Sequence, residues 1–135
     1  MRRQPRRIIY LDNDDPTARQ VSRVFGGAFH VLHVQNPRRM IGLLETDPTI
    51  AAVITEQVLR CGNGVELLES VRTLRPQVRR VMLTGYADLA SIVVGLHSGA
   101  IQCLLHKPVG DADLLSGVCP EIAERAATVQ RRASA

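Results

Sequence analysis

Aromatic residues are scarce in this chain: its 135 residues include two tyrosines, two phenylalanines and no tryptophan. Hydrophobic residues nevertheless make up 45% of the sequence, so a core must be built mainly from aliphatic side chains. Long apolar runs are absent too, and a membrane-spanning helix needs roughly 18 such residues. The four apolar residues after the basic N-terminus are too few for a signal peptide. These absences exclude a transmembrane protein and favour one globular domain with no membrane partner.

Cysteine is also rare, with three residues at Cys61, Cys103 and Cys119. An odd number without C-x-x-C spacing excludes a disulfide framework and a zinc site, and it indicates a reducing compartment. We therefore expect a cytoplasmic protein. Cys103 lies in an apolar run and is interpreted as a small core residue.

Lysine is almost missing, although the chain is basic. Among seventeen basic residues only Lys107 is a lysine, and the formal net charge is +4. The arginines are scattered, some in pairs such as Arg38-Arg39 and Arg79-Arg80, without aromatic residues between them. Such a distribution is typical of a solvated basic surface rather than of a nucleic-acid interface. We expect no nucleic-acid binding by this domain.

Five short apolar runs predict buried strands, each followed by a segment with apolar residues at helical spacing. The predicted strands span residues 8–11, 29–34, 51–55, 81–84 and 101–105. The first helix is expected to begin with Asp15 as its N-cap and Pro16 in the first helical position. The fourth helix is expected to bury Leu89, Ile92, Val93 and Leu96.

The strands and helices alternate five times with short connections. This order predicts an α/β fold with one parallel sheet, right-handed crossovers and helices on both faces. We expect a single doubly wound domain at residues 7–119, preceded by a basic tail at residues 1–6. Because Pro120 would break a continuous helix, residues 120–135 are expected to form a helical tail or linker.

Polar side chains follow four of the five predicted strands. In an open parallel sheet, ligands and reacting groups gather outside the carboxyl ends of the strands. The residues found there are Asp12, Asn13, Asp14, Glu56, Thr84 and Lys107. Packing alone would not select this set, so the sequence predicts a polar pocket in which they meet. His30, His33 and His106 lack the spacing of metal ligands and are interpreted as surface or edge residues.

These residues and their surroundings resemble the receiver domains of bacterial response regulators over about residues 7–119. The resemblance rests on the acids after the first strand, on GVELL at residues 64–68, on LTGYAD at residues 83–88 and on Lys107-Pro108. Residues 55–107 are especially similar to receivers attached to HD-GYP phosphodiesterases and to hybrid histidine kinases. The resemblance implies a flavodoxin-like, CheY-like fold with five strands in the order 2-1-3-4-5.

The resemblance also implies a chemistry. In receivers an acidic pair holds Mg²⁺, an aspartate after the third strand accepts a phosphoryl group from a histidine kinase, and a threonine and a lysine bind the phosphoryl oxygens. By position, the acidic pocket is Asp12, Asn13 and Asp14, the phosphoacceptor position is Glu56, and the phosphate contacts are Thr84 and Lys107. If Mg²⁺ binds, its ligands are Asp12, Asp14 and Glu56. A cis peptide bond before Pro108 is implied as well.

Three departures from the family pattern affect this chemistry. Glu56 has one methylene more than aspartate, which moves its carboxylate by roughly 1.5 Å, and a misplacement of that size can cost about a hundredfold in rate. Asn13 replaces one acid, whether the pair is Asp12-Asn13 or Asn13-Asp14, so no resident cofactor is expected and Mg²⁺ binding should be weak. Leu104 replaces an aromatic residue three positions before the lysine, which excludes aromatic rotamer switching.

We therefore expect a degenerate receiver module in two-component signalling, not an enzyme, that acts by phosphorylation-independent protein contact. Without a metal, Asp12 and Glu56 would repel by about 4 kcal/mol at about 4 Å and an effective dielectric constant of about 20. Lys107 between them would remove much of this repulsion, so we predict a Glu56–Lys107 pair. The alternative leaves Glu56 as an exposed loop acid and Lys107 as a strand cap.

Two other functions remain open from the sequence. One is an ordinary Mg²⁺-dependent receiver with Glu56 as the acceptor. The other is a small-molecule or nucleotide sensor that binds an anion beside Lys107, although no glycine-rich phosphate loop follows the first strand. The expected partners are a histidine kinase or an effector or output domain. A homodimer is expected at the family's usual surface, formed by the fourth helix, fifth strand and fifth helix.

Overall fold

The computed structural model describes residues 6–60, 62–85, 89–121 and 131–132. Five parallel strands form one sheet in the order β2-β1-β3-β4-β5, as predicted. The strands are β1 (Arg7–Leu11), β2 (His30–Val34), β3 (Ile50–Thr55), β4 (Arg79–Thr84) and β5 (Cys103–His106). The last strand begins two residues later than predicted, because the N–H of Ile101 donates to the carbonyl of Gly95 instead of pairing in the sheet.

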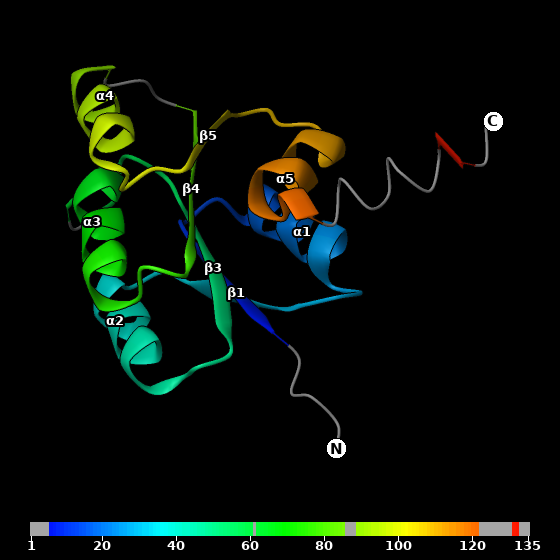
Figure 1. The fold of residues 1–135 in the computed structure, drawn as a ribbon, viewed down its shortest axis with the longest axis horizontal. Coiled ribbons are helices and arrows are strands. Elements are labelled where there is room, and N and C mark those ends of the chain that lie inside the picture. Colours follow the sequence, from blue (N-terminus) through cyan, green and yellow to red (C-terminus); the bar gives the residue numbers. More distant parts are fainter. Residues whose placement is uncertain (1–5, 61, 86–88, 122–130, 133–135) are drawn as a thin grey trace.

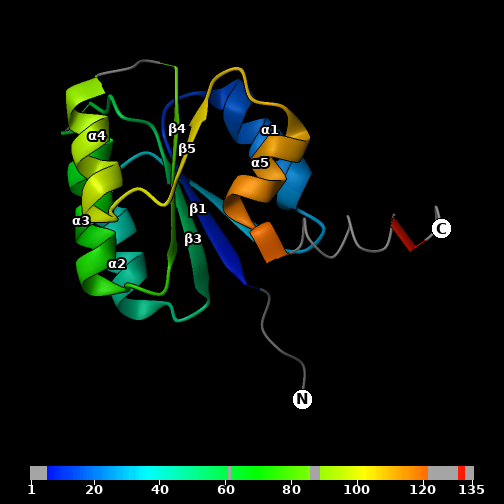
Figure 2. The same cartoon turned by 45° about the horizontal axis from the view of Figure 1, so that its top comes forward.

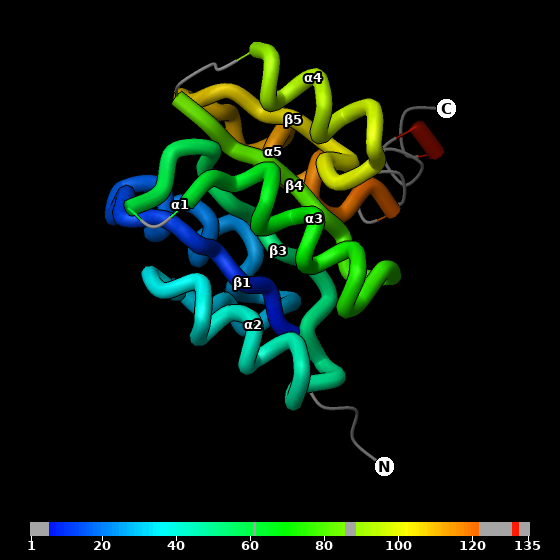
Figure 3. Tube along the Cα trace, turned by 90° about the vertical axis from the view of Figure 1, so that its left-hand side faces the viewer, coloured from blue at the N-terminus to red at the C-terminus, as the bar shows by residue number. Residues whose placement is uncertain are grey.

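Helices cover both faces of the sheet. They are α1 (Asp15–Phe25), α2 (Pro37–Thr46), α3 (Gly64–Leu74), α4 (Leu89–Ser98) and α5 (Asp111–Val118). The helices α2, α3 and α4 lie on one face and α1 and α5 on the other (Figure 1), and the turned view keeps this separation (Figure 2). Figure 3 looks onto the face covered by α2, α3 and α4. The doubly wound prediction is therefore confirmed.

Each face of the sheet has its own apolar cluster, because successive side chains of a strand point to opposite faces. From β1, Ile9 and Leu11 pack with residues of α2, α3 and α4, whereas Ile8 and Tyr10 pack with residues of α1 and α5. All four side chains are at most 1% exposed. Strands covered on both faces have nearly continuous apolar sequences, which explains why short apolar runs predicted them.

The first helix begins one residue earlier than predicted. Asp14, not Asp15, is the N-cap of α1: its backbone is extended and its Oδ1 accepts the N–H of Thr17 at 3.2 Å. The Thr17 hydroxyl also donates to Asp14 Oδ2, at 2.6 Å. The first N–H groups of a helix have no carbonyl partner within the helix. A carboxylate at the N-cap supplies an acceptor for one of them. The correction places the Asp14 carboxylate at the carboxyl edge of the sheet.

The buried face of α4 also differs from the prediction. Of the four residues expected in the core, only Ile92 is buried, whereas Leu89 and Val93 are 69% and 60% exposed. Gly95 is the other buried residue of this helix. A Cβ atom on Gly95 would lie 2.7 Å from Ile101 Cδ1, so α4 approaches the chain there at its glycine. The helix is apolar on more sides than its single contact face can bury.

Arg80 is not part of a solvated surface, which corrects the interpretation of its pair with Arg79. Its side chain is 5% exposed, and its guanidinium donates to the carbonyls of Pro76, Val78, Gly99 and Ala100. These carbonyls lie before β4 and after α4, where backbone groups lack regular partners. Arg80 therefore closes the amino end of the sheet against the end of α4.

The last helix of the domain, α5, ends at Val118, and Cys119 is its C-cap. Pro120 and Glu121 are helical again, in keeping with a break at the proline. Most of the tail predicted at residues 120–135, and residues 1–5 of the basic tail, lie outside the described residues. Within the described part of the chain, no helix is long and apolar enough to cross a membrane.

Candidate functional site

The predicted polar residues meet at the carboxyl edge of the sheet. Because β1 lies beside β3, Asp12 and Glu56, which follow these two strands, are neighbours. Because β4 pairs with β5, Thr84 lies close to Lys107, whose backbone N–H donates to the Thr84 carbonyl at 2.9 Å. The sheet order alone thus brings residues from four distant segments into one cluster.

Lys107 is at the centre of this cluster. Its Nζ lies 2.7 Å from Asp12 Oδ2, 3.0 Å from Asp14 Oδ2 and 3.0 Å from Glu56 Oε2. An ammonium group has three N–H donors, so each carboxylate can accept one. Burial by itself lowers the pKa of Lys107, but the hydrogen bonds to the three carboxylates raise it by more. The pKa is therefore above its usual value, and the ammonium keeps its proton.

The Glu56 carboxylate is buried, with 7% of the residue exposed, and both oxygens have fixed donors. Oε1 accepts the backbone N–H of Gln57 at 2.7 Å and the hydroxyl of Thr84. Oε2 accepts the backbone N–H of Gly85 at 3.1 Å in addition to Lys107. Glu56 is therefore not an exposed loop acid, and Lys107 is one of four groups that donate to its carboxylate.

The backbone beneath Glu56 is held by the start of α3. Gln57 is 3% exposed; its side-chain Oε1 accepts the N–H of Val65 at 3.1 Å, and its carbonyl accepts the N–H of Gly64 at 2.9 Å. A Cβ atom on Gly64 would collide with the Glu56 carbonyl and lie 2.9 Å from Met82 Cε. This close approach requires glycine. It fixes the backbone from which the Glu56 carboxylate extends.

The two aspartates have donors of their own. Asp12 accepts the Tyr10 hydroxyl on Oδ2 at 3.0 Å and the backbone N–H of Asn13 on Oδ1 at 2.7 Å. Burial, and then the charge of Asp12, raise the pKa of Tyr10 above its usual value, so the hydroxyl remains a donor. The hydrogen bond from the Thr17 hydroxyl lowers the pKa of Asp14 to about 2, assisted by Lys107 and opposed by burial.

The structure changes the interpretation of the acidic pair. Asn13 is exposed, whereas Asp12 and Asp14 on either side of it both contact Lys107. The loop after β1 therefore contributes two carboxylates to the cluster, those of Asp12 and Asp14, and the pair is formed by the acids on either side of Asn13. The sequence left two registers open because neighbouring residues of a loop need not point the same way.

His33 was missed by the sequence interpretation. It is half-buried; its Nε2 lies 2.6 Å from the Asp12 carbonyl, and its ring centroid is 5.5 Å from that of Tyr10. The predicted pairing of the first two strands could have identified it, because β1 and β2 pair with His33 opposite Tyr10. His30 and His106 are exposed.

The remaining candidates lie at or beside the cluster. Leu104 is half-buried and packs against the apolar cluster on the face of α2, α3 and α4. The Lys107–Pro108 peptide bond is cis. Cys103 is half-buried and packs against the other apolar cluster. Of the LTGYAD segment, residues 86–88 lie outside the described part of the chain, as does Cys61.

The three carboxylates have the oxygen donors that Mg²⁺ prefers, but in this arrangement the protein itself supplies donors to them. Each of the six oxygens of Asp12, Asp14 and Glu56 already accepts at least one hydrogen bond from the protein. Lys107 Nζ contacts all three groups. Among the described residues, no group of three or more His, Cys, Asp or Glu residues is arranged to hold a metal ion.

Comparison with known proteins identifies the family. The sequence matches the response regulator receiver domain over residues 8–118. The chain belongs to this family. As a receiver domain it is a module of two-component signalling, and the expectation drawn from the residues at the strand ends is confirmed at that level.

Curated relatives of this receiver are regulatory proteins. The chain is 29% identical over 119 residues to the acid tolerance regulatory protein ActR of Rhizobium meliloti, covering 87% of this chain and 60% of that protein. It is 29% identical over 100 residues to the photosynthetic apparatus regulatory protein RegA of Cereibacter sphaeroides, covering 73% and 54%. The chain thus spans little more than half the length of these relatives.

The fold agrees with solved receivers. A CheY-like receiver domain protein from Methanospirillum hungatei JF-1 matches with a TM-score of 0.78 and 25% identity, covering 93% of this chain and 99% of that one. The finer resemblance to receivers attached to HD-GYP phosphodiesterases or hybrid kinases stays a prediction.

Proposed function

We propose that this receiver is degenerate: Glu56 occupies the phosphoacceptor position, and the domain signals without being phosphorylated. One observation carries the proposal. The Glu56 carboxylate contacts the Thr84 hydroxyl and the Lys107 ammonium, the two groups to which the family resemblance assigns the binding of phosphoryl oxygens. The additional methylene of glutamate extends the carboxylate to the place where a receiver would hold its phosphoryl group.

The contacts of Glu56 also disfavour phosphoryl transfer. An acceptor oxygen must approach the phosphorus in line with the leaving group. Here Oε1 accepts hydrogen bonds from Gln57 and Thr84, and Oε2 from Gly85 and Lys107. An attacking oxygen would have to give up part of these contacts, and the phosphoryl group would need the space that the carboxylate itself fills.

We propose that weak Mg²⁺ binding accompanies this state. Magnesium dehydrates reluctantly and demands nearly ideal octahedral geometry. To bind here it would have to displace the Lys107 ammonium, which already balances part of the charge of Asp12, Asp14 and Glu56. The domain is accordingly proposed to have no catalytic activity and no resident cofactor.

We further propose that this receiver works in the cytoplasm through contact with a histidine kinase or with an effector or output domain. A homodimer through α4, β5 and α5 is part of the proposal. It is supported by Leu89, Val93 and Leu96 of α4, which are 69%, 60% and 43% exposed, because contiguous exposed apolar residues mark protein-binding surfaces. Sedimentation velocity tests it: a dimer weakened by Val93→Asp supports the interface, and a monomeric parent at high concentration contradicts it.

Phos-tag electrophoresis after incubation with acetyl phosphate and Mg²⁺ tests phosphorylation independence. The parent should migrate like the Glu56→Ala variant, which has no acceptor. Glu56→Asp should show a shifted band, because the shorter side chain restores the usual position of the carboxylate, and we expect labelling about a hundredfold faster than in the parent. A parent labelled as fast as Glu56→Asp would refute the proposal.

Differential scanning fluorimetry provides a second measurement. Mg²⁺ with beryllofluoride should leave the Tm of the parent unchanged and raise that of Glu56→Asp, since only an aspartate offers the beryllofluoride its usual acceptor. A rise in the parent would favour the ordinary Mg²⁺-dependent receiver. A rise with one member of a nucleotide panel would favour the sensor.

A further inference from the structure

Of the three carboxylates around Lys107, that of Asp12 lies nearest. Lys107 Nζ is 2.7 Å from Asp12 Oδ2, and 3.0 Å from both Asp14 Oδ2 and Glu56 Oε2. Each carboxylate also has other donors that hold it in place, and these donors differ in kind. The groups that orient Asp12 therefore help to set where the ammonium of Lys107 lies.

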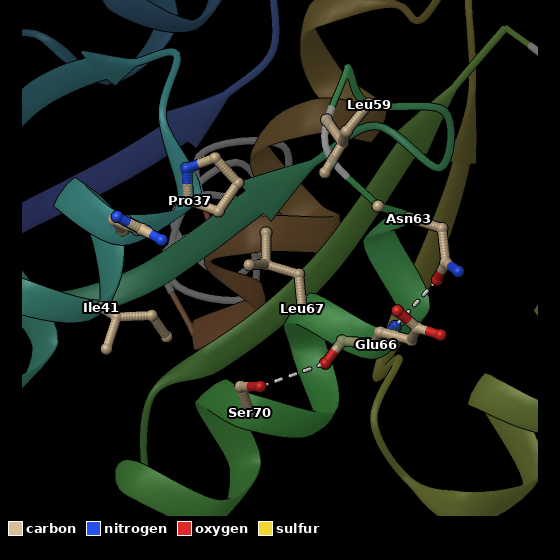
Figure 4. A pocket seen from close by; sticks show the side chains of 9 residues that line it. Pro37, Ile41, Leu59, Asn63, Glu66, Leu67 and Ser70 are labelled. Carbon is tan, nitrogen blue, oxygen red and sulfur yellow. Dashed lines mark hydrogen bonds between the residues drawn. The ribbon is translucent and has the colours of Figure 1, made fainter.

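Glu56 is oriented largely by backbone groups. The N–H groups of Gln57 and Gly85 donate to its two carboxylate oxygens. The segment that follows Glu56 leads to Asn63, the N-cap of α3, whose Oδ1 accepts the N–H of Glu66 (Figure 4). Because backbone donors are present whatever the side chain, this support depends little on the identity of the residues that supply it.

Asp12, in contrast, is oriented by side chains from two neighbouring strands. The Tyr10 hydroxyl donates to Asp12 Oδ2 at 3.0 Å, the same oxygen that Lys107 contacts. His33 Nε2 lies 2.6 Å from the Asp12 carbonyl, and because a carbonyl can only accept, Nε2 is the donor. Tyr10 on β1 is paired with His33 on β2, and their ring centroids are 5.5 Å apart. The two side chains thus hold Asp12 at its carboxylate and at its backbone.

The Tyr10 hydroxyl is fixed in its position. The residue is 0% exposed, and its ring packs in the apolar cluster on the face of α1 and α5. A buried tyrosine hydroxyl needs a hydrogen-bond partner, and the structure gives it the Asp12 carboxylate. If this carboxylate turned toward solvent, the hydroxyl would be left buried and unpaired, which is costly. Tyr10 therefore opposes any rotation of Asp12 away from Lys107.

We propose that Tyr10 and His33 are positioning residues for Lys107. They hold Asp12 so that the ammonium is shared among three carboxylates instead of being drawn toward Glu56 and Asp14 alone. This inference deepens the proposed function and rests on it, because Lys107 is the cation that balances Glu56 in the proposed unphosphorylated state. It names the side chains that keep this cation in place.

The first experiment observes the ammonium group directly. Lys107 is the only lysine of the chain, so selective ¹⁵N-lysine labelling gives a single ammonium signal. The parent should show a signal whose protons exchange slowly with water, since they are hydrogen-bonded and largely shielded. Tyr10→Phe keeps the ring and removes the donor, and at the same pH it should shift the signal and quicken the exchange about tenfold. An unchanged signal and exchange rate would overturn the inference.

The second experiment compares two substitutions of His33, which is half-buried on the edge strand β2. His33→Gln keeps an N–H donor for the Asp12 carbonyl and should preserve the exchange rate of the parent. His33→Leu removes the donor and should quicken the exchange about threefold, because its contact is with the backbone of Asp12 and not with the carboxylate. Rescue by glutamine does not follow if His33 only fills space. Equal rates in the two variants would refute its role.

Phe25→Leu is the matched control for a loss of stability. Phe25 is 1% exposed and belongs to the same apolar cluster as Tyr10. The substitution should lower the Tm at least as far as Tyr10→Phe does, and it should leave the Lys107 signal unchanged. A control that quickens the exchange as much as Tyr10→Phe would overturn the inference.

The inference and the proposed function fail separately. Ready phosphorylation of the parent in the Phos-tag experiment would refute the proposed function. The effect of Tyr10→Phe on the Lys107 signal is measured in unphosphorylated protein, so its absence would refute the positioning role whatever the Phos-tag result.

Discussion

Two basic side chains at opposite ends of the sheet are stabilised in different ways. Lys107, at the carboxyl edge, has three carboxylates within 3.0 Å of Nζ. Arg80, near the amino end of β4, is more deeply buried and donates to four backbone carbonyls. Among the described residues no ion pair involves Arg80. One cation is held by titratable groups and the other by neutral ones.

This difference distinguishes the two edges of the sheet. We call the carboxyl edge around Lys107 the signalling edge, and the amino edge around Arg80 the scaffold. Backbone carbonyls keep the same charge at every pH, so the Arg80 contacts hold the end of α4 under all conditions. Carboxylates change charge on protonation, metal binding or covalent modification. The groups that can change charge are therefore concentrated at the edge where Lys107, Glu56 and the two aspartates meet.

Removing the ammonium group of Lys107 should have the largest effect. Lys107→Met keeps the aliphatic stem but leaves three carboxylates facing one another, and breaking such a partly buried ion cluster costs about 3 kcal/mol. Urea unfolding followed by circular dichroism measures this loss.

The matched control for that variant is Arg23→Met. The Arg23–Asp111 pair has good geometry, with 2.6 Å between Nη1 and Oδ2, but both side chains are more than half exposed. Exposed pairs contribute little to stability, so the unfolding midpoint should remain close to that of the parent. Equal unfolding midpoints for the Lys107 and Arg23 variants would show that the Lys107 cluster stabilises the domain no more than an exposed ion pair does.

Arg80→Met should have the second largest effect, about 2 kcal/mol, because four carbonyls lose their donor at a buried position. It should show the same loss at pH 5 and pH 8, since none of the four carbonyl acceptors titrates. Hydrogen exchange should quicken at the end of α4 and leave the loop after β3 unaffected. A strongly pH-dependent loss would contradict the contrast between the two edges.

The sequence predicted the signalling edge better than the scaffold. Glu56 and Lys107 were identified because they follow apolar strands, and parallel pairing necessarily gathers strand ends at one edge. The register of Asp12, Asn13 and Asp14 was not predictable in this way. It depends on which carboxylate caps α1, and Asp14 and Asp15 are chemically identical candidates.

The amino edge escaped prediction for a physical reason. In the sequence, Arg80 cannot be distinguished from an exposed arginine. Two of the four carbonyls that it contacts, those of Gly99 and Ala100, belong to a segment about twenty residues away. The exposed side of α4 escaped it because Gly95, not a large apolar residue, makes the close contact with Ile101. Helical spacing marks which residues share a face but not which face meets the sheet when most of the helix is apolar.

The smallest expected effect is that of removing the charge of Asp14. It tests the comparison between the two edges of the sheet at acid pH. Its pKa is about 2 in the folded protein, below the usual 3.8, so its contribution to stability is complete above pH 4 and is lost as the pH falls toward 2. Asp14→Asn keeps an N-cap of α1 but removes the charge. The difference in the free energy of unfolding between parent and variant should therefore be about 1 kcal/mol larger at pH 6 than at pH 2.5, after allowance for solvent screening. Carboxylates that do not share Lys107 with Asp14 are unaffected by the substitution and cancel in this difference. A difference that does not change with pH would mean that neither the Thr17 hydrogen bond nor the Lys107 contact stabilises the charged form of Asp14.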